Sequence, residues 1–139
     1  MKILLDTNVV LDVLLAREPF VDLAREIFIL IENKEIEGHL CATSVTTLHY
    51  LIGRETNKKE ANEIIEKLLI LFEVSPVTKK VLYDASVNNG IDYEDSVIYT
   101  SAYYSDINII VTRDKRGFKE SKISSLTPKE FLAFFESKK

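Results

Sequence analysis

The sequence is poor in the residues that form linkers and disulfides. Its 139 residues include one cysteine, three prolines, four glycines and no tryptophan. The single cysteine, Cys41, excludes an internal disulfide, and its apolar surroundings predict a buried thiol in a reducing compartment. So few glycines and prolines leave little material for a flexible linker, and the length is common for one domain. We therefore expect a single cytoplasmic domain spanning residues 1–139.

Long apolar runs and an excess of positive charge are also missing. Asp6 and Asp12 interrupt the apolar stretch near the N-terminus, which excludes a signal peptide or a membrane span there. The formal net charge of −4 and the pI near 5.3 argue against a protein that coats nucleic acid by bulk electrostatics. Residues 113–122 are a local exception, with five basic and two acidic residues. This basic segment is either a local nucleic-acid contact or a solvated loop.

Apolar periodicity predicts short strands that alternate with helices. Residues 2–5 and 107–111 are apolar runs with abrupt polar ends, and the second is strongly β-branched. Further strands are predicted at residues 39–42, 71–74 and 123–126. Apolar spacings of three and four predict helices at residues 20–31, 43–52, 61–69, 78–90 and 92–102, and another from Pro128. This alternation predicts an α/β fold with a central, mainly parallel sheet of four to five strands, covered by helices on both faces.

Aspartates stand where ligands bind in such a sheet. Asp6 ends the first predicted strand and Asp114 closely follows the fourth, and the carboxyl ends of parallel strands share one edge. Asp95 opens the helix before that later strand and can project onto the same edge, with Asp92 one turn earlier. Each aspartate alone could instead cap a helix or end a strand. Crowded together, they would repel by about 4 kcal/mol per pair at a separation of about 4 Å. A bound divalent cation is the simplest way to offset this repulsion, and oxygen ligands favour Mg²⁺ or Mn²⁺.

Four short motifs occur in order along the chain. They are Leu4-Leu5-Asp6-Thr7-Asn8, Ala42-Thr43-Ser44-Val45-Thr46-Thr47, Asp92-Tyr93-Glu94-Asp95-Ser96, and Val111-Thr112-Arg113-Asp114 with Gly117-Phe118. Together they resemble the PIN domain family, the fold of the toxin ribonucleases of bacterial and archaeal toxin–antitoxin pairs, over essentially the whole chain. The resemblance implies a three-layer α/β/α fold, an Mg²⁺- or Mn²⁺-dependent endoribonuclease acting on RNA, a homodimer, and inhibition by a cognate antitoxin protein.

The resemblance also implies roles for individual acids. By position, Asp6, Asp95 and Asp114 look like the catalytic and metal-binding residues of the family. The family usually adds a glutamate in its third helix, where residues 47–51 of this chain contain no acid. Either another acid supplies the missing charge, or the metal binds more weakly, or the chain is a PIN-like module that has lost catalysis and binds RNA or a protein partner. The candidates for a substitute acid are Asp92 and Glu94.

Other residues close to these acids are candidates for supporting roles. A bound metal ion can orient a water molecule, lower its pKa and stabilise charge on the scissile phosphate, so no nucleophilic side chain is needed. Asn8, Thr112 and Ser96 are expected to position water, phosphate oxygens or the acids. The predicted RNA-binding residues are Arg113, Lys115 and Arg116, which could contact the flanking phosphates.

Aromatic residues gather in the later helices. Five of the six tyrosines fall there, namely Tyr83, Tyr93, Tyr99, Tyr103 and Tyr104. They could stack on unpaired RNA bases, or they could pack in the core or at its rim. The apolar and aromatic positions left over after one core is filled predict a homodimer through the helices at residues 78–89 and 92–105.

Two other classes of site need residues that this chain lacks. A phosphatase of the haloacid dehalogenase type would have a second aspartate two residues after Asp6, where Asn8 stands. A receiver domain would have paired acids after the first strand. Dinucleotide and nucleoside triphosphate sites need a glycine-rich turn after a strand, and the four glycines form no such cluster. A metal-dependent nuclease is therefore the favoured interpretation.

Overall fold

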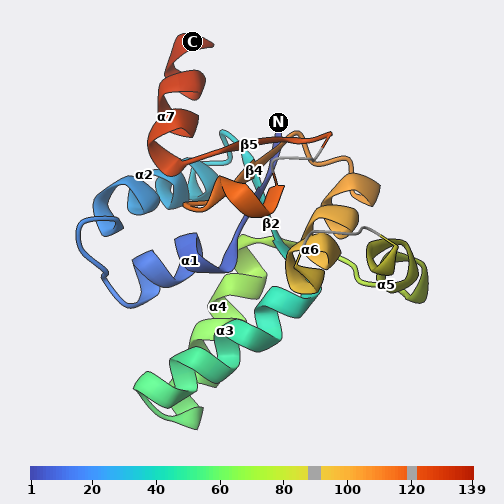
Figure 1. The fold of residues 1–139 in the computed structure, drawn as a ribbon. Helices are drawn as coiled ribbons and strands as arrows, with labels where there is room; N and C mark the ends of the chain where they lie inside the picture. Colours follow the sequence, from blue (N-terminus) through green and yellow to red (C-terminus); the bar gives the residue numbers. More distant parts are fainter. Residues whose placement is uncertain (88–91, 119–121) are drawn as a thin grey trace.

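Five strands form one parallel sheet in the computed structural model, which describes residues 1–87, 92–118 and 122–139 (Figure 1). They are β1 (Lys2–Leu5), β2 (Glu37–Cys41), β3 (Glu73–Ser75), β4 (Ile109–Val111) and β5 (Ser124–Leu126). Their order across the sheet is β3-β2-β1-β4-β5, and every neighbouring pair is parallel. β1 and β4 are internal neighbours, with Leu5 opposite Val111. The predicted fold class is confirmed, and so is the internal position of the two strands that precede Asp6 and Asp114.

Helices cover both faces of this sheet (Figure 1). They are α1 (Thr7–Leu14), α2 (Val21–Glu32), α3 (Ala42–Glu55), α4 (Lys58–Leu71), α5 (Lys79–Ser86), α6 (Tyr93–Tyr104) and α7 (Pro128–Ser137), with a short 3₁₀ helix η1 (Lys115–Phe118). Side chains alternate along a strand, so Ile3 and Leu5 pack in a core with α1, α2 and α7. Leu4 and Ile110 face the opposite way and pack under α6. The resulting three layers are those expected from the sequence. No helix in the described part of the chain has the length and apolar character needed to cross a membrane.

Several predicted boundaries need correction. The sequence pattern does not predict α1, because the unbroken apolar run Val9-Val10-Leu11 shows no helical alternation. All three residues are buried in the structure. The predicted strands at 39–42, 71–74 and 107–111 are instead 37–41, 73–75 and 109–111. Helix α4 continues to Leu71, so β3 begins later in the sequence than predicted. The expected end of the predicted helix at residues 78–90 lies outside the described residues.

The start of α7 agrees with the sequence pattern. The Thr127 hydroxyl accepts a hydrogen bond from the Glu130 backbone N–H, and the Glu130 carboxylate accepts one from the Thr127 N–H. Pro128 occupies the first turn, where its missing N–H has no cost. This capping box fixes α7 directly after β5, beside the edge of the sheet that carries Asp6.

Candidate functional site

Asp6 joins the end of β1 to the start of α1. Its Oδ1 accepts a hydrogen bond from the Thr7 backbone N–H at 2.8 Å, so Asp6 does cap a helix. Its Oδ2 accepts a second bond, at 2.7 Å, from the hydroxyl of Thr112, which is fully buried after β4. Burial raises the pKa of Asp6, the bonds from Thr112 and Thr7 oppose that rise, and the charge of Asp114 adds to it. Capping therefore uses one oxygen, and the other is oriented by the neighbouring strand.

Asp114 is held in the loop that follows β4. Its backbone N–H donates to Thr112 Oγ1 at 3.1 Å, so one hydroxyl contacts both Asp6 and Asp114. The Asp114 carboxylate turns toward Arg116, with Nε–Oδ1 at 2.9 Å and Nη2–Oδ2 at 3.0 Å. This guanidinium lowers the pKa of Asp114. Asp114 is thus near Asp6, but a cation from the chain already balances its charge.

Asp95 approaches the same place from the first turn of α6. Burial raises its pKa to about 6, and nearby negative charges contribute to that rise. In decreasing order, these charges belong to Asp6, Asp92, Glu94 and Asp114. Asp92 is the N-cap of α6, where its carboxylate accepts a hydrogen bond from the Asp95 N–H at 3.3 Å. The charges of the other predicted acids therefore all act on Asp95 at this edge of the sheet.

Gly117 allows η1 to close over Asp95. A Cβ atom built on Gly117 would lie 2.4 Å from Asp95 Oδ2 and 3.0 Å from its Cγ. Any larger residue would have to displace the carboxylate or the backbone of η1. Phe118, the next residue, is buried in the core under α6 and so anchors η1. The packing thus defines the position of the Asp95 carboxylate.

The donor chemistry of these acids suits a hard divalent cation. All the donors are carboxylate oxygens, which Mg²⁺ and Mn²⁺ prefer. The ion pairs among described residues include neither Asp6 nor Asp95. Within the same residues, no three histidine, cysteine or acidic groups are grouped closely enough to hold an ion. Asp6 and Asp95 could therefore provide ligands as placed, whereas Asp114 could join them only after leaving Arg116.

The remaining predicted supporting residues lie in different surroundings. The Ser96 hydroxyl is fully buried and donates to the Ala85 carbonyl oxygen at 2.9 Å, which fastens α6 to α5. Asn8 is exposed in the first turn of α1, and Glu94 is exposed in the first turn of α6. Of the three supporting residues, Thr112 makes hydrogen bonds with both Asp6 and Asp114.

Each predicted RNA-binding residue forms an ion pair with an acid. Lys115 Nζ lies 2.9 Å from Glu130 Oε1, and Arg116 pairs with Asp114. Arg113 pairs with Asp12, with its Nε 2.7 Å from Oδ2. Lys119, from the same basic segment, lies outside the described residues. The basic segment is therefore partly neutralised by the chain itself.

Asp12 is a residue whose role sequence reasoning missed. It is fully buried in α1 and also lies 3.9 Å from Arg17 Nη1, in addition to its bonds with Arg113. The sequence did contain a signal for this role, namely a charged residue inside an apolar stretch. Such a residue argues against a membrane span, and if it is buried it also needs a partner of opposite charge. The partner could not be identified, since Arg113 is 101 residues away along the chain.

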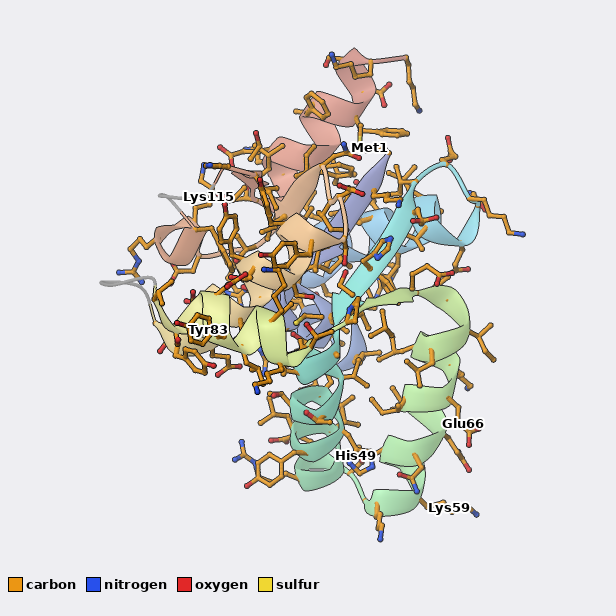
Figure 2. All side chains as sticks on the ribbon, turned by 90° about the vertical axis from the view of Figure 1, so that its right-hand side faces the viewer. Met1, His49, Lys59, Glu66, Tyr83 and Lys115 are labelled. Atoms are coloured by element: carbon orange, nitrogen blue, oxygen red, sulfur yellow. The ribbon has the colours of Figure 1, made fainter. Side chains whose placement is uncertain are left out.

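The third helix provides no acid to the site. Its first turn borders Asp6, where the Thr7 hydroxyl donates to Ser44 Oγ at 3.1 Å. His49, further along α3, is hydrogen-bonded to Asn62 of α4 at 2.6 Å. Figure 2 shows His49 on the α3–α4 hairpin, well separated from Lys115 in η1. This histidine therefore does not replace the glutamate that the family usually has in its third helix.

Several solved structures have a similar fold. FitAcB from Neisseria gonorrhoeae is 22% identical over 91% of this chain and 97% of that chain, with a TM-score of 0.68. A toxin–antitoxin complex from Klebsiella pneumoniae is 13% identical over 90% and 96%, also with a TM-score of 0.68. VapC20 from Mycobacterium tuberculosis, a toxin that cleaves the sarcin–ricin loop, is 14% identical over 83% and 92%, with a TM-score of 0.66. Such low identities establish a shared fold.

A family model decides the classification. The model described as the PIN domain matches residues 2–116, which include β1, β4 and all three predicted acids. A comparison with curated proteins finds no match. The parallel sheet, its strand-end aspartates and this match over most of the sequence agree, and the chain belongs to the PIN domain family.

Proposed function

We propose that this chain is a metal-dependent endoribonuclease and the toxin of a toxin–antitoxin pair. The observation that carries the proposal is the meeting of Asp6, Asp95 and Asp114, from three separate segments, at one edge of the sheet. The charge of Asp114 contributes to the raised pKa of Asp6, and the charges of Asp6 and Asp114 contribute to that of Asp95, which reaches about 6. Perturbed carboxylates grouped at the carboxyl edge of a parallel sheet are typical of functional sites. Membership of the PIN domain family supports the same proposal.

Asp6 and Asp95 would hold Mg²⁺ or Mn²⁺, with Asp114 completing the set and Asp92 or Glu94 providing further charge. A bound divalent ion lowers the pKa of water and offsets negative charge on the scissile phosphate. The role of the chain is to keep the acids in place. Thr112 orients Asp6, and the close approach of Gly117 defines the position of Asp95.

Arg116 would take part in RNA binding through an exchange of partners. It now balances Asp114, and its side chain is 89% exposed. A cation that binds Asp114 competes with this guanidinium, and a released Arg116 would be free to contact a phosphate of single-stranded RNA. Lys115 would contribute in the same way after leaving Glu130, since that pair is also exposed. The two residues would bind the backbone and carry no sequence preference.

Two protein partners belong to the proposal. A cognate antitoxin fits the toxin–antitoxin complex found among the similar structures. A second copy of the chain fits the apolar side chains exposed on α5 and α6, which include Tyr83, labelled in Figure 2. The other members of this group are Leu82, Val87, Tyr93, Tyr103 and Tyr104. Light scattering at tens of micromolar protein should give the dimer mass, and a monomer mass alone would remove the dimer from the proposal.

The test of the proposal is cleavage of single-stranded RNA by the purified protein. With Mn²⁺ the parent should cut, chelator should stop cutting, and Asp95→Asn should reduce the rate by about a hundredfold or more while staying folded. The control is Asp22→Asn, because Asp22 is an exposed acid on α2 and, among the described residues, forms an ion pair only with Arg25. A variant Asp95→Asn that cuts like the control would exclude Asp95 from the site. A parent inert with both metals would favour a PIN-like binding module that has lost catalysis.

A further inference from the structure

A buried carboxylate contacts the loop that carries Asp114. Asp12, near the end of α1, is 0% exposed. Its two oxygens accept hydrogen bonds from Arg113, from Nε at 2.7 Å and from Nη2 at 3.3 Å. The Arg113 guanidinium also lies over the ring of Phe20, 3.9 Å from its centroid. These contacts leave the guanidinium little freedom to move.

Arg113 stands between two residues of the candidate metal site. Thr112, just before it, donates to Asp6 at the start of α1. Arg113 itself binds Asp12 near the end of the same helix, which spans only Thr7–Leu14. The loop after β4 is therefore fastened to α1 at two points, six residues apart in sequence. Asp114 follows directly, so its backbone is positioned by both attachments.

We propose that Asp12 is a positioning residue for the metal site, which it serves by anchoring Arg113. This inference rests on the proposed metal site at Asp6, Asp95 and Asp114. The anchor has two effects on that site. It fixes the backbone that joins Thr112 to Asp114, and it draws the guanidinium toward Asp12, so that Arg113 does not become a competing cation for Asp6. Arg113 is close enough for its charge to act on Asp6 even in the anchored position.

A purely structural ion pair would behave differently. If Asp12 only stabilised the fold, replacing it would lower the melting temperature, and the molecules that remained folded would bind metal as before. If Asp12 positions the site, replacing it releases Arg113 beside Asp6 and loosens the loop before Asp114. Groups that orient metal ligands from outside typically contribute about tenfold to a hundredfold in metal affinity. The affinity of the folded protein for Mn²⁺ therefore separates the two roles.

The experiment is calorimetric titration of the full chain with Mn²⁺, well below the melting temperature of each variant. Asp12→Asn keeps the shape of the side chain and should bind Mn²⁺ about tenfold to a hundredfold more weakly than the parent. Asp22→Asn, the exposed control, should bind like the parent. The double variant Asp12→Asn with Arg113→Gln removes the competing charge and keeps an amide pair, so it should recover part of the lost affinity.

Arg113→Lys covers the case in which Asp12→Asn does not fold. Lysine keeps the charge but cannot form the bidentate contact that the guanidinium makes with Asp12. This variant should therefore also bind Mn²⁺ more weakly than the parent. If the single variant that folds melts at a lower temperature but binds Mn²⁺ as tightly as the parent, the positioning role is wrong. The proposed metal site would be unaffected by that result. A parent that binds no Mn²⁺ would overturn the metal site and this inference together.

Discussion

Two aspartates near the same edge of the sheet illustrate opposite ways of handling a negative charge. Asp12 is fully buried but accepts two hydrogen bonds from Arg113 and has Arg17 nearby. Asp95 is only half-buried, yet the pKa of its carboxyl group rises to about 6 because burial and neighbouring acids act in the same direction. No ion pair of the described residues includes Asp95.

The difference shows that burial by itself does not indicate function. A buried acid with a well-oriented cation is balanced within the chain, and its interactions hold elements together. A less buried acid among like charges, with no ion-pair partner among the described residues, favours a proton or a cation from solution. This contrast supports the proposal that Asp12 positions the site and that Asp95 belongs to its metal-binding surface.

The largest expected effect comes from removing the cation that balances Asp12. Arg113→Met leaves a buried carboxylate with only the more distant Arg17, and it should lower the free energy of unfolding by about 3–5 kcal/mol. Urea unfolding measures this. The matched control is Arg25→Met, which breaks an exposed pair within α2 and should cost about 0.5 kcal/mol or less. A loss no larger than that of the control would mean that Asp12 tolerates burial without its partner.

The second effect is the response of Asp95 to added metal. Mn²⁺ at about a hundred times its dissociation constant should stabilise the parent by about 2.7 kcal/mol, because only the folded chain assembles the ligands. Asp95→Asn should gain much less under the same conditions. Thermal melting with Mn²⁺ and with chelator checks both proteins. If Mn²⁺ does not change the melting temperature of the parent, Asp95 does not bind the metal and, like Asp12, has no direct role in metal binding.

The third effect is the stability of Asp95→Asn without metal. The pKa of Asp95 is higher in the folded state than the ordinary aspartate value of 3.8, so the folded protein resists losing that proton. The resulting destabilisation is absent at pH below 3.8, develops between about 4 and 6, and is complete above that range. At pH 8, Asp95→Asn should be more stable than the parent by about 1 kcal/mol after solvent screening, and the gain should be smaller at pH 5. Equal gains at both pH values would contradict this origin.

The smallest effect has the opposite sign and concerns Asp114. Its pKa is lowered by Arg116, so its charge is already favourable in the folded state. In chelator, Asp114→Asn should melt slightly below the parent, whereas Asp95→Asn should melt above it. The crowding expected from sequence alone would have raised both melting temperatures. A rise for Asp114→Asn would indicate that repulsion from Asp6 and Asp95 outweighs the pair with Arg116.

Local patterns predicted much of the sheet and one helix start. The apolar run at Lys2–Leu5 and its end at Asp6 are found as expected, and the capping box at Thr127 was readable because its partners lie three residues apart. The first helix was harder to recognise. Val9 and Val10 are β-branched and sit in a continuous apolar run, so their pattern does not separate a helix from a strand. Burial in the assembled core decided in favour of α1.

By itself, the sequence determined which acids end strands and where the chain alternates between strand and helix. Those signals act between residues a few positions apart. The tertiary structure decided which charges meet. The pairing of β1 with β4 brings Thr112 to Asp6, and the same crossing brings Arg113 to Asp12 over 101 residues of chain. Whether an acid is balanced or exposed to a cation from solution depends on those distant contacts, because electrostatic energy follows distance in space and burial, and not order along the chain.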